Sequence, residues 1–201
     1  GTIELLPPFN REEALDGLTG VSHVWLIFLF HQSLTNPDSV RLKVRPPRLG
    51  GNQQLGVFAT RSNFRPNGIG QSLVKLDSIE GTRLKVSGVD LLDQTPILDI
   101  KPYVPYADAI PAAINEIAPA PPELMQVDWS ENAERAAQEV EAKSGNPVTG
   151  LINECLAQDP RPAYQAHDPE RIYGTQLWQV NVRWKYPTPE KILVLSVEWL
   201  D

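Results

Sequence analysis

The order of hydrophobic and polar residues predicts a chain built mainly of strands. The densest apolar run, Val21 to Phe30, is rich in β-branched and aromatic residues, which is typical of a fully buried central strand. Polar and apolar residues alternate from Arg83 to Ser87, as in a strand with one buried face. Further strands are expected at Thr2–Leu6, Leu55–Ala59, Ser72–Ile79 and Ile97–Ile100, and a hairpin is expected from Leu177–Trp184 and Ile192–Trp199.

Two capping-box patterns predict where helices begin. The residues 10–13 (NREE) precede a short helix that Gly17 would end, with Asn10 as the capping residue. The residues 128–131 (DWSE) precede a longer helix that Gly145 would end. A further helix is expected over Val148–Ala157, because a proline follows soon after it.

Six prolines between residues 102 and 122 separate the chain into two parts. Proline fixes φ and removes a backbone donor, so this stretch is predicted to be an extended connection. The predicted fold class is therefore mainly β with an α+β appendage. Residues 1–122 are expected to form the β core, and residues 123–201 a smaller α+β C-terminal domain.

The composition narrows the class of protein. The single cysteine, Cys155, excludes a disulfide framework and favours a buried structural thiol in a reducing, cytoplasmic compartment. The longest apolar run is shorter than the roughly 20 residues that span a bilayer, so no membrane segment is expected. The three histidines (His23, His31 and His167) lack metal-ligand spacing, so no metal site is expected, and His23 is expected to lie in the core.

Basic residues are concentrated in one stretch of an acidic chain. Residues 40–75 carry seven of the 18 Lys and Arg residues and no Asp or Glu, so the net charge of −7 is divided into +7 there and −14 elsewhere. Such asymmetry predicts a polyanionic partner. Arginines stiffened by neighbouring prolines, as in Arg45-Pro-Pro-Arg48, suit phosphate or carboxylate, although a solvated basic loop is the plain alternative.

Two further segments could carry chemistry. The turn from Asp90 to Pro96 places two carboxylates and a hydroxyl together, which suits acid–base work or a ribose diol; an Asx-turn that holds its own backbone would look the same. Arg161 and Tyr164 combine a guanidinium with an aromatic ring, which suits stacking on an unpaired base. The segment 68–73 (GIGQSL) lacks the last glycine of a dinucleotide fingerprint.

Several long segments together resemble one protein family. They are Ser22–Gln32, Val44–Gly51, Gly56–Asn67, Asp90–Tyr103 and Asp159–Tyr164. In this order they resemble the TrmO (TsaA/YaeB-like) family of S-adenosylmethionine-dependent tRNA methyltransferases. The resemblance implies a small β-barrel methyltransferase core, unlike the Rossmann type, and a homodimer. It also implies methylation of the exocyclic N6 amine of threonylcarbamoyladenosine, next to the anticodon of tRNA.

The resemblance also assigns residues. Contacts to the cofactor S-adenosylmethionine are implied for His31, Gln32, Arg61, Gln71, Asp93, Gln94, Thr95 and Pro96. We expect Asp93, or another carboxylate near Asp90, to be the catalytic proton acceptor, because the acceptor nitrogen carries a carbonyl substituent and is a poor nucleophile. Contacts to the tRNA anticodon loop are expected from Arg45, Arg48, Arg65, Asn67, Lys101, Arg161 and Tyr164, the last two with the loop or the threonyl group.

The chain departs from the family pattern in three places. Gln94 stands where the family has glycine, and Gly68 where it commonly has proline. A cofactor-contacting segment that usually precedes the position of Gly1 is not part of this sequence, so the pocket is expected to be incomplete. The alternatives left open are a non-catalytic RNA- or nucleotide-binding β-barrel module and a methyltransferase acting on another small acceptor.

Overall fold

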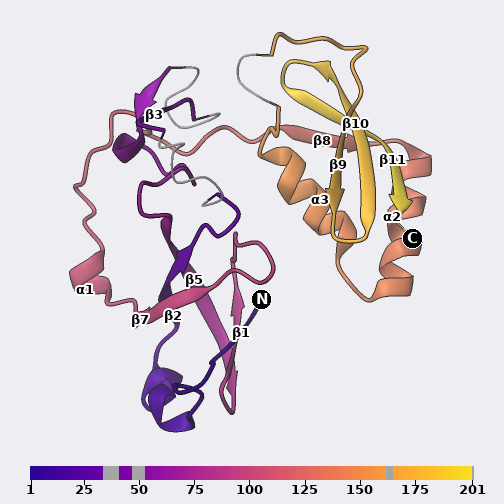
Figure 1. Cartoon of the computed structure of the whole chain (residues 1–201). Helices are drawn as coiled ribbons and strands as arrows, with labels where there is room; N and C mark the ends of the chain where they lie inside the picture. The colour runs from indigo at the N-terminus through magenta and orange to yellow at the C-terminus, as the bar shows by residue number, and fades with distance from the viewer. Residues whose placement is uncertain (34–40, 47–52, 162–164, 201) are drawn as a thin grey trace. The chain divides into compact units, whose positions relative to one another are not determined.

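The computed structural model describes residues 1–33, 41–46, 53–161 and 165–200 (Figure 1). Two compact units are present, an N-terminal unit that ends at Glu116 and a C-terminal unit that begins at Ile117. Each unit has its own hydrophobic core. The domain boundary expected at residue 122 stays a prediction.

The N-terminal unit is organised around β2 (His23–Leu29). Its sheet has the order β1-β6-β5-β2-β7, and every pairing in it is antiparallel. The other members are β1 (Thr2–Glu4), β5 (Ile69–Glu80), β6 (Arg83–Ser87) and β7 (Ile97–Pro102). The expected strand over the long apolar run is therefore confirmed, and it lies inside the sheet.

Only one face of β2 is fully buried, so the expectation that the whole strand is buried was wrong. Val24, Leu26 and Phe28 lie in the core, whereas the residues between them are half-buried. An antiparallel sheet commonly packs only one face against the core, even where the other face is also apolar. The His23 side chain is half-buried rather than part of the core, and its Nδ1 lies 3.0 Å from Ser22 Oγ.

Local structure differs from the expectation at several connections. The first helix is a 3₁₀ turn, Glu12–Leu15, whose N-cap is Arg11, so the predicted cap at Asn10 was wrong. The expected strand Leu55–Ala59 is a short β4 (Leu55–Gly56), paired with β3 (Lys43–Val44), and then a 3₁₀ turn. The proline-rich connection contains one turn of helix, α1 (Pro105–Asp108).

The C-terminal unit packs two helices and a four-stranded sheet. The helices are α2 (Glu131–Ser144) and α3 (Val148–Ala157). The sheet has the order β8-β11-β10-β9, formed by β8 (Gln126–Trp129), β11 (Lys191–Trp199), β10 (Val180–Thr188) and β9 (Tyr173–Leu177). Only the pairing of β8 with β11 is parallel.

Capping residues define both ends of α2. Ser130 Oγ accepts from the amide of Ala133, so Ser130 is the N-cap of this helix. The predicted cap at Asp128, which lies in β8, was wrong by two residues. Gly145 ends α2 with φ of 70°, as expected. The bounds of α3 and the existence of the β10–β11 hairpin are confirmed, but the first hairpin strand begins at Val180 and ends at Thr188, later than predicted. The strand β9, which ends at Leu177, was missed, because its sequence, Tyr-Gly-Thr-Gln-Leu, lacks a dense apolar run.

The fold class, mainly β with an α+β C-terminal part, is confirmed, and the antiparallel N-terminal sheet is not a Rossmann sheet. Within the described residues β1 and β7 are the ends of that sheet, so its closure into a barrel stays a prediction. No helix in the described part of the chain is long and apolar enough to cross a membrane.

We predict that Gly70→Ala destabilises the N-terminal unit by about 1–3 kcal/mol through overpacking. A Cβ atom at Gly70 would lie 2.4 Å from the ring of Phe28 and 2.9 Å from that of Phe30. Denaturant unfolding measures the change. Gly56→Ala is the matched control, because nothing lies within 4 Å of its added Cβ and φ is −60°. Equal stabilities of the two variants would contradict the packing constraint at Gly70.

Candidate functional site

Four segments that are distant in sequence meet where β2 ends. The amide of Leu29 donates to the carbonyl of Pro96 at 3.0 Å, and the amide of Phe30 donates to the carbonyl of Gly68 at 2.7 Å. Asn63 Nδ2 donates to Ser33 Oγ at 2.9 Å. These bonds place the predicted cofactor residues His31–Gln32, Arg61, Gln71 and Asp93–Pro96 on segments that adjoin the same end of the sheet.

Two glycines make this close approach possible. Gly68 has φ of 62°, which proline cannot adopt. The backbone at this position therefore differs from that of family members that have proline there. Gly70 is opposite Phe28 in the register, and the rings of Phe28 and Phe30 meet edge to face over it, with centroids 5.1 Å apart. Gln71, the next residue, therefore faces the opposite side of the sheet from this aromatic pair.

The turn from Asp90 to Pro96 is held partly by its own backbone. Thr95 donates both its amide and its hydroxyl to the carbonyl of Leu92, at 3.3 and 2.7 Å. The carboxylate of Asp90 accepts from Ser72 Oγ at 2.7 Å, which fixes the turn to β5. Gln94 has φ of 61°, so it adopts the left-handed conformation that a glycine would take more easily, and the turn keeps its shape at a cost of about 1 kcal/mol.

Most of the polar side chains expected to bind the cofactor are available to a ligand. No hydrogen bond or ion pair from the side chains of His31, Gln32, Arg61, Gln71 or Asp93 is made within the described residues. Carboxylate, amide and guanidinium groups match the amine, carboxylate and ribose hydroxyls of S-adenosylmethionine. The residues present therefore fit this cofactor, while their individual roles stay predictions.

The loop that carries Arg61 is clamped by Arg65. Arg65 Nη1 donates to the carbonyls of Val57 and Thr60, at 2.7 and 2.8 Å, and its guanidinium lies 5.5 Å from the centroid of the Phe58 ring. A charged donor shared by two carbonyls fixes the intervening turn. Arg65 was expected to contact tRNA; this role stays a prediction, because one side of its guanidinium is already engaged in shaping the loop.

The other residues expected to bind tRNA are in three situations. Arg45, Asn67 and Lys101 are exposed, and within the described residues neither Arg45 nor Lys101 forms an ion pair. Arg48 and Tyr164 lie outside the described residues. Arg161 belongs to the C-terminal unit and is half-buried.

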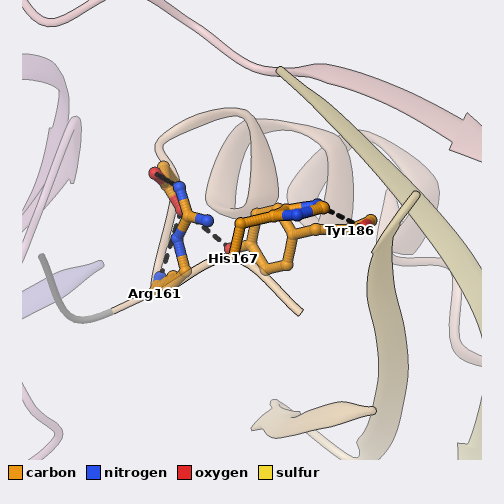
Figure 2. A network of polar contacts seen from close by, with 4 residues as sticks. Arg161, His167 and Tyr186 are labelled. Carbon is orange, nitrogen blue, oxygen red and sulfur yellow. Dashed lines mark hydrogen bonds and ion pairs between the residues drawn. The ribbon is translucent and has the colours of Figure 1, made fainter. Parts of the chain in front are cut away.

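Arg161 is part of a polar network formed partly by residues that follow α3 in the sequence (Figure 2). The carboxylate of Asp159 accepts from Arg161 Nη2 at 3.2 Å and from the hydroxyl of Tyr186 at 2.8 Å. The guanidinium lies 4.6 Å from the centroid of the Tyr186 ring, and His167 Nε2 donates to the Tyr186 carbonyl at 2.9 Å. Burial, followed by the bond to Asp159, raises the pKa of Tyr186 above its ordinary value, so this hydroxyl stays protonated as a donor.

Sequence reasoning missed the partners of Arg161. Tyr186 lies in an alternating apolar strand and reads as core, and it is indeed buried. The sequence signal for a special turn was the Asp159-Pro160 pair. In the structure φ at Asp159 is 47°, a left-handed conformation that Asp tolerates better than most residues. In the described part of the chain, no group of three His, Cys, Asp or Glu side chains is arranged to hold a metal ion.

Comparison with known proteins matches both units. A model of the tRNA-methyltransferase O N-terminal domain matches residues 1–109, and a model of the TrmO C-terminal domain matches residues 122–199. A Pseudomonas aeruginosa protein with the provisional name S-adenosylmethionine-dependent methyltransferase RcsF is 62% identical over 98% of this chain and 84% of its own length. The Escherichia coli K12 tRNA (adenine(37)-N6)-methyltransferase is 44% identical over 92% of this chain and 80% of its own length.

A solved structure agrees with these matches. The crystal structure of TrmO from P. aeruginosa superposes with a TM-score of 0.81, at 54% identity, over 99% of this chain and 83% of that one.

We predict that Arg65→Ala loosens the loop from residue 57 to residue 68. Alanine removes the charged donor that Val57 and Thr60 share, so amide hydrogen exchange in this loop is expected to accelerate by about tenfold or more. The amide of Thr60, which donates to Val57, reports the effect directly. Arg61→Ala is the control, because the Arg61 side chain makes no such contacts among the described residues, and equal exchange in both variants would argue against the clamp.

Proposed function

This chain belongs to the TrmO family of tRNA methyltransferases, and we propose that it methylates the N6 amine of threonylcarbamoyladenosine next to the anticodon. It is an S-adenosylmethionine-dependent tRNA methyltransferase. The observation that carries the proposal is that both family models match in order, across a chain whose expected cofactor residues adjoin one end of β2. A non-catalytic RNA-binding module is not favoured, because the named relatives are methyltransferases.

The residues of the chain have distinct roles in this proposal. S-adenosylmethionine, when bound, supplies an activated methyl group. His31, Gln32, Arg61, Gln71 and the turn from Asp93 to Pro96 would orient it, and alignment of donor and acceptor supplies much of the rate enhancement in such a displacement. The exposed carboxylate of Asp93 is the proposed acceptor of the proton that the N6 nitrogen loses.

Recognition of the tRNA would come from the basic loops and from the C-terminal unit. Phosphates of the anticodon loop are proposed to be contacted by Arg45, Arg48, Asn67 and Lys101. Arg65 is proposed to contribute the N–H groups that are not bonded to the carbonyls of Val57 and Thr60. An anticodon loop presents its bases unpaired, so no duplex needs to be opened. Arg161 and Tyr164 are proposed to contact the loop or the modified base.

We further propose a cytoplasmic homodimer. Support comes from the face of the N-terminal sheet opposite the core, where β2 and β5 present an apolar strip. Ile69 and Leu73 are 45% and 38% exposed there, opposite the half-buried Leu29 and Trp25. A second copy that covered this strip would also approach Gln71, which lies between them on the same face.

The test of the function is a calorimetric titration with S-adenosylhomocysteine, followed by a methyl-transfer assay on tRNA that contains threonylcarbamoyladenosine. Binding and transfer are both expected. Asp93→Asn should lower the single-turnover rate by about 100- to 10,000-fold, and more strongly than it weakens cofactor binding. Asp16→Asn is the control, since Asp16 is exposed and distant in sequence from the turn. A rate unchanged by Asp93→Asn would remove Asp93 as proton acceptor. No binding or transfer, either by this chain or by a version that also carries the preceding family segment, would refute the function.

Arg45→Gln should weaken binding to all tRNAs alike. Because each phosphate contact releases counterions, the slope of log K against log salt should become shallower by about 0.7–0.9. Arg83→Gln is the control, because Arg83 Nη2 already pairs with Glu4 at 2.9 Å. Binding is measured at several salt concentrations, and an unaltered slope in Arg45→Gln would exclude a phosphate contact there.

A further inference from the structure

Two phenylalanine rings are exposed on the segment that follows β4. Phe58 is 76% exposed and Phe64 is 36% exposed. A single exposed apolar side chain needs no explanation, because much of any protein surface is apolar. These two rings, however, lie in the stretch 40–75, which carries seven basic residues and no acidic one. Aromatic rings within a basic surface are typical of proteins that bind single-stranded nucleic acid.

The backbone below Phe58 is held in place. Phe58 is the middle residue of the 3₁₀ turn Val57–Ala59, and the side chain of Val57 is buried. The Val57 amide donates to the carbonyl of Leu42 at 2.9 Å, and its carbonyl accepts from Arg65 Nη1 at 2.7 Å. The Phe58 ring is therefore presented to solvent from a fixed base.

Two guanidiniums bring both rings into one cluster of loops. The guanidinium of Arg65 lies 5.5 Å from the centroid of the Phe58 ring, and that of Arg41 lies 4.2 Å from the centroid of the Phe64 ring. Phe64 directly precedes Arg65 in the chain. Arg41 directly precedes Leu42, whose carbonyl accepts from the amide that precedes Phe58. Each ring therefore contacts an arginine from the segment that holds the other ring or its turn.

Rings and charge together select one class of ligand. Because Phe58 is 76% exposed, most of its ring surface is open beside the guanidinium of Arg65. Unpaired bases stack on phenylalanine rings and on arginine planes. The phosphates that join such bases are attracted by a stretch with seven positive charges and no negative one. An apolar protein surface would use the rings but would gain nothing from the charge.

We propose that Phe58 and Phe64 form a stacking platform on which this chain binds unpaired bases of RNA, whatever their sequence and whether or not they are modified. Arg41 is exposed and supplies N–H groups to a phosphate of the same strand. The choice of RNA rests on the proposed function, whereas the preference for unpaired bases follows from the rings. The platform contributes affinity that does not depend on the modified base.

A supporting role for the rings is the alternative. In that role Phe58 only holds the guanidinium of Arg65 in place, so its loss would weaken binding to every nucleic acid. A duplex keeps its phosphates exposed but hides the faces of its bases, which stack on one another. Only stacking on the platform therefore requires a loss of affinity that is confined to single strands.

The experiment measures the affinity of the full chain for an unmodified RNA strand of about 12 nucleotides and for the same strand paired with its complement. The parent chain should bind the single strand more tightly. Phe58→Ala and Phe64→Ala should each weaken single-strand binding by about tenfold. The slope of log K against log salt should stay unchanged in Phe58→Ala, because no phosphate contact is removed.

Two further variants serve as controls. Phe58→Trp should retain the affinity of the parent chain, because an indole ring also stacks on bases. Phe9→Ala is the matched control, because Phe9 is 72% exposed but lies outside the basic stretch. Its affinity for both RNAs should equal that of the parent chain.

Several outcomes would overturn the platform. They are a parent chain without a preference for the single strand, a Phe58→Ala variant that binds as well as Phe9→Ala, and an equal loss for single strand and duplex in Phe58→Ala, which would indicate the supporting role. Sedimentation without RNA tests whether a second copy covers the rings. A Phe58→Ala variant that keeps its RNA affinity but sediments as a smaller species would assign Phe58 to that contact.

Failure of the platform can be told apart from failure of the proposed function. Binding of S-adenosylhomocysteine and methyl transfer to tRNA are measured separately from binding to the unmodified strand. A chain that transfers methyl groups although Phe58→Ala keeps its affinity refutes the platform alone. Single-strand binding through Phe58 without methyl transfer upholds the platform and counts against the proposed function alone.

Discussion

The close pairing of β2 with the start of β5 is the constraint on which the N-terminal unit depends. At Gly70 the backbone of β5 approaches the rings of Phe28 and Phe30 more closely than any side chain would permit. This packing fixes the register in which Gln71 lies opposite Ile27. The same strand end binds the turn at Pro96 and, through Ser33, the loop at Asn63. The segments that contain Asn63, Gly68 and Pro96 thus meet at the strand end beside this closely packed glycine.

Non-glycine residues with a left-handed backbone occur in both units. Gln94 has a left-handed backbone in a turn whose amide, hydroxyl and carboxylate bonds hold it from both sides. Asp159 has the same kind of backbone in the C-terminal unit, where its carboxylate joins Arg161 to Tyr186. Such conformations persist only where surrounding contacts over-determine them, and they are frequent at functional sites. In both turns, therefore, the left-handed backbone costs some free energy of folding, and hydrogen bonds of the surrounding side chains hold it in place.

Much of the architecture could be predicted from the sequence. The central strand, α3 and the end of α2 at Gly145 follow from apolar runs, a proline stop and a glycine cap. The predicted cap at Asp128 failed because Asp128 lies in β8, which pairs with the distant β11, so the helix begins only after that strand. Ser130 caps α2 although Ala133, rather than Glu or Gln, follows it three residues later. The expected cofactor residues came from a family resemblance, since no spacing rule brings Gln71 to the turn at Asp93. The pairing of β2 with β5 and with the turn at Pro96 brings them to the same end of the sheet. The hydrophobic periodicity of the sequence does not specify this pairing.

The arginines differ in whether they are exposed as free charges or bound within the fold. The amino-acid composition does not reveal this difference. Arg45 and Arg65 belong to the same acid-free stretch of sequence, yet one is exposed without an ion pair and the other is bound to two carbonyls. Arg161 is bound differently again, stacked on a buried tyrosine. A solvated cation attracts RNA of any sequence, whereas a guanidinium fixed in a partly buried frame can distinguish one substituent from another. The exposed guanidinium of Arg45 and the stacked, half-buried guanidinium of Arg161 are therefore chemically different groups, although both belong to arginine.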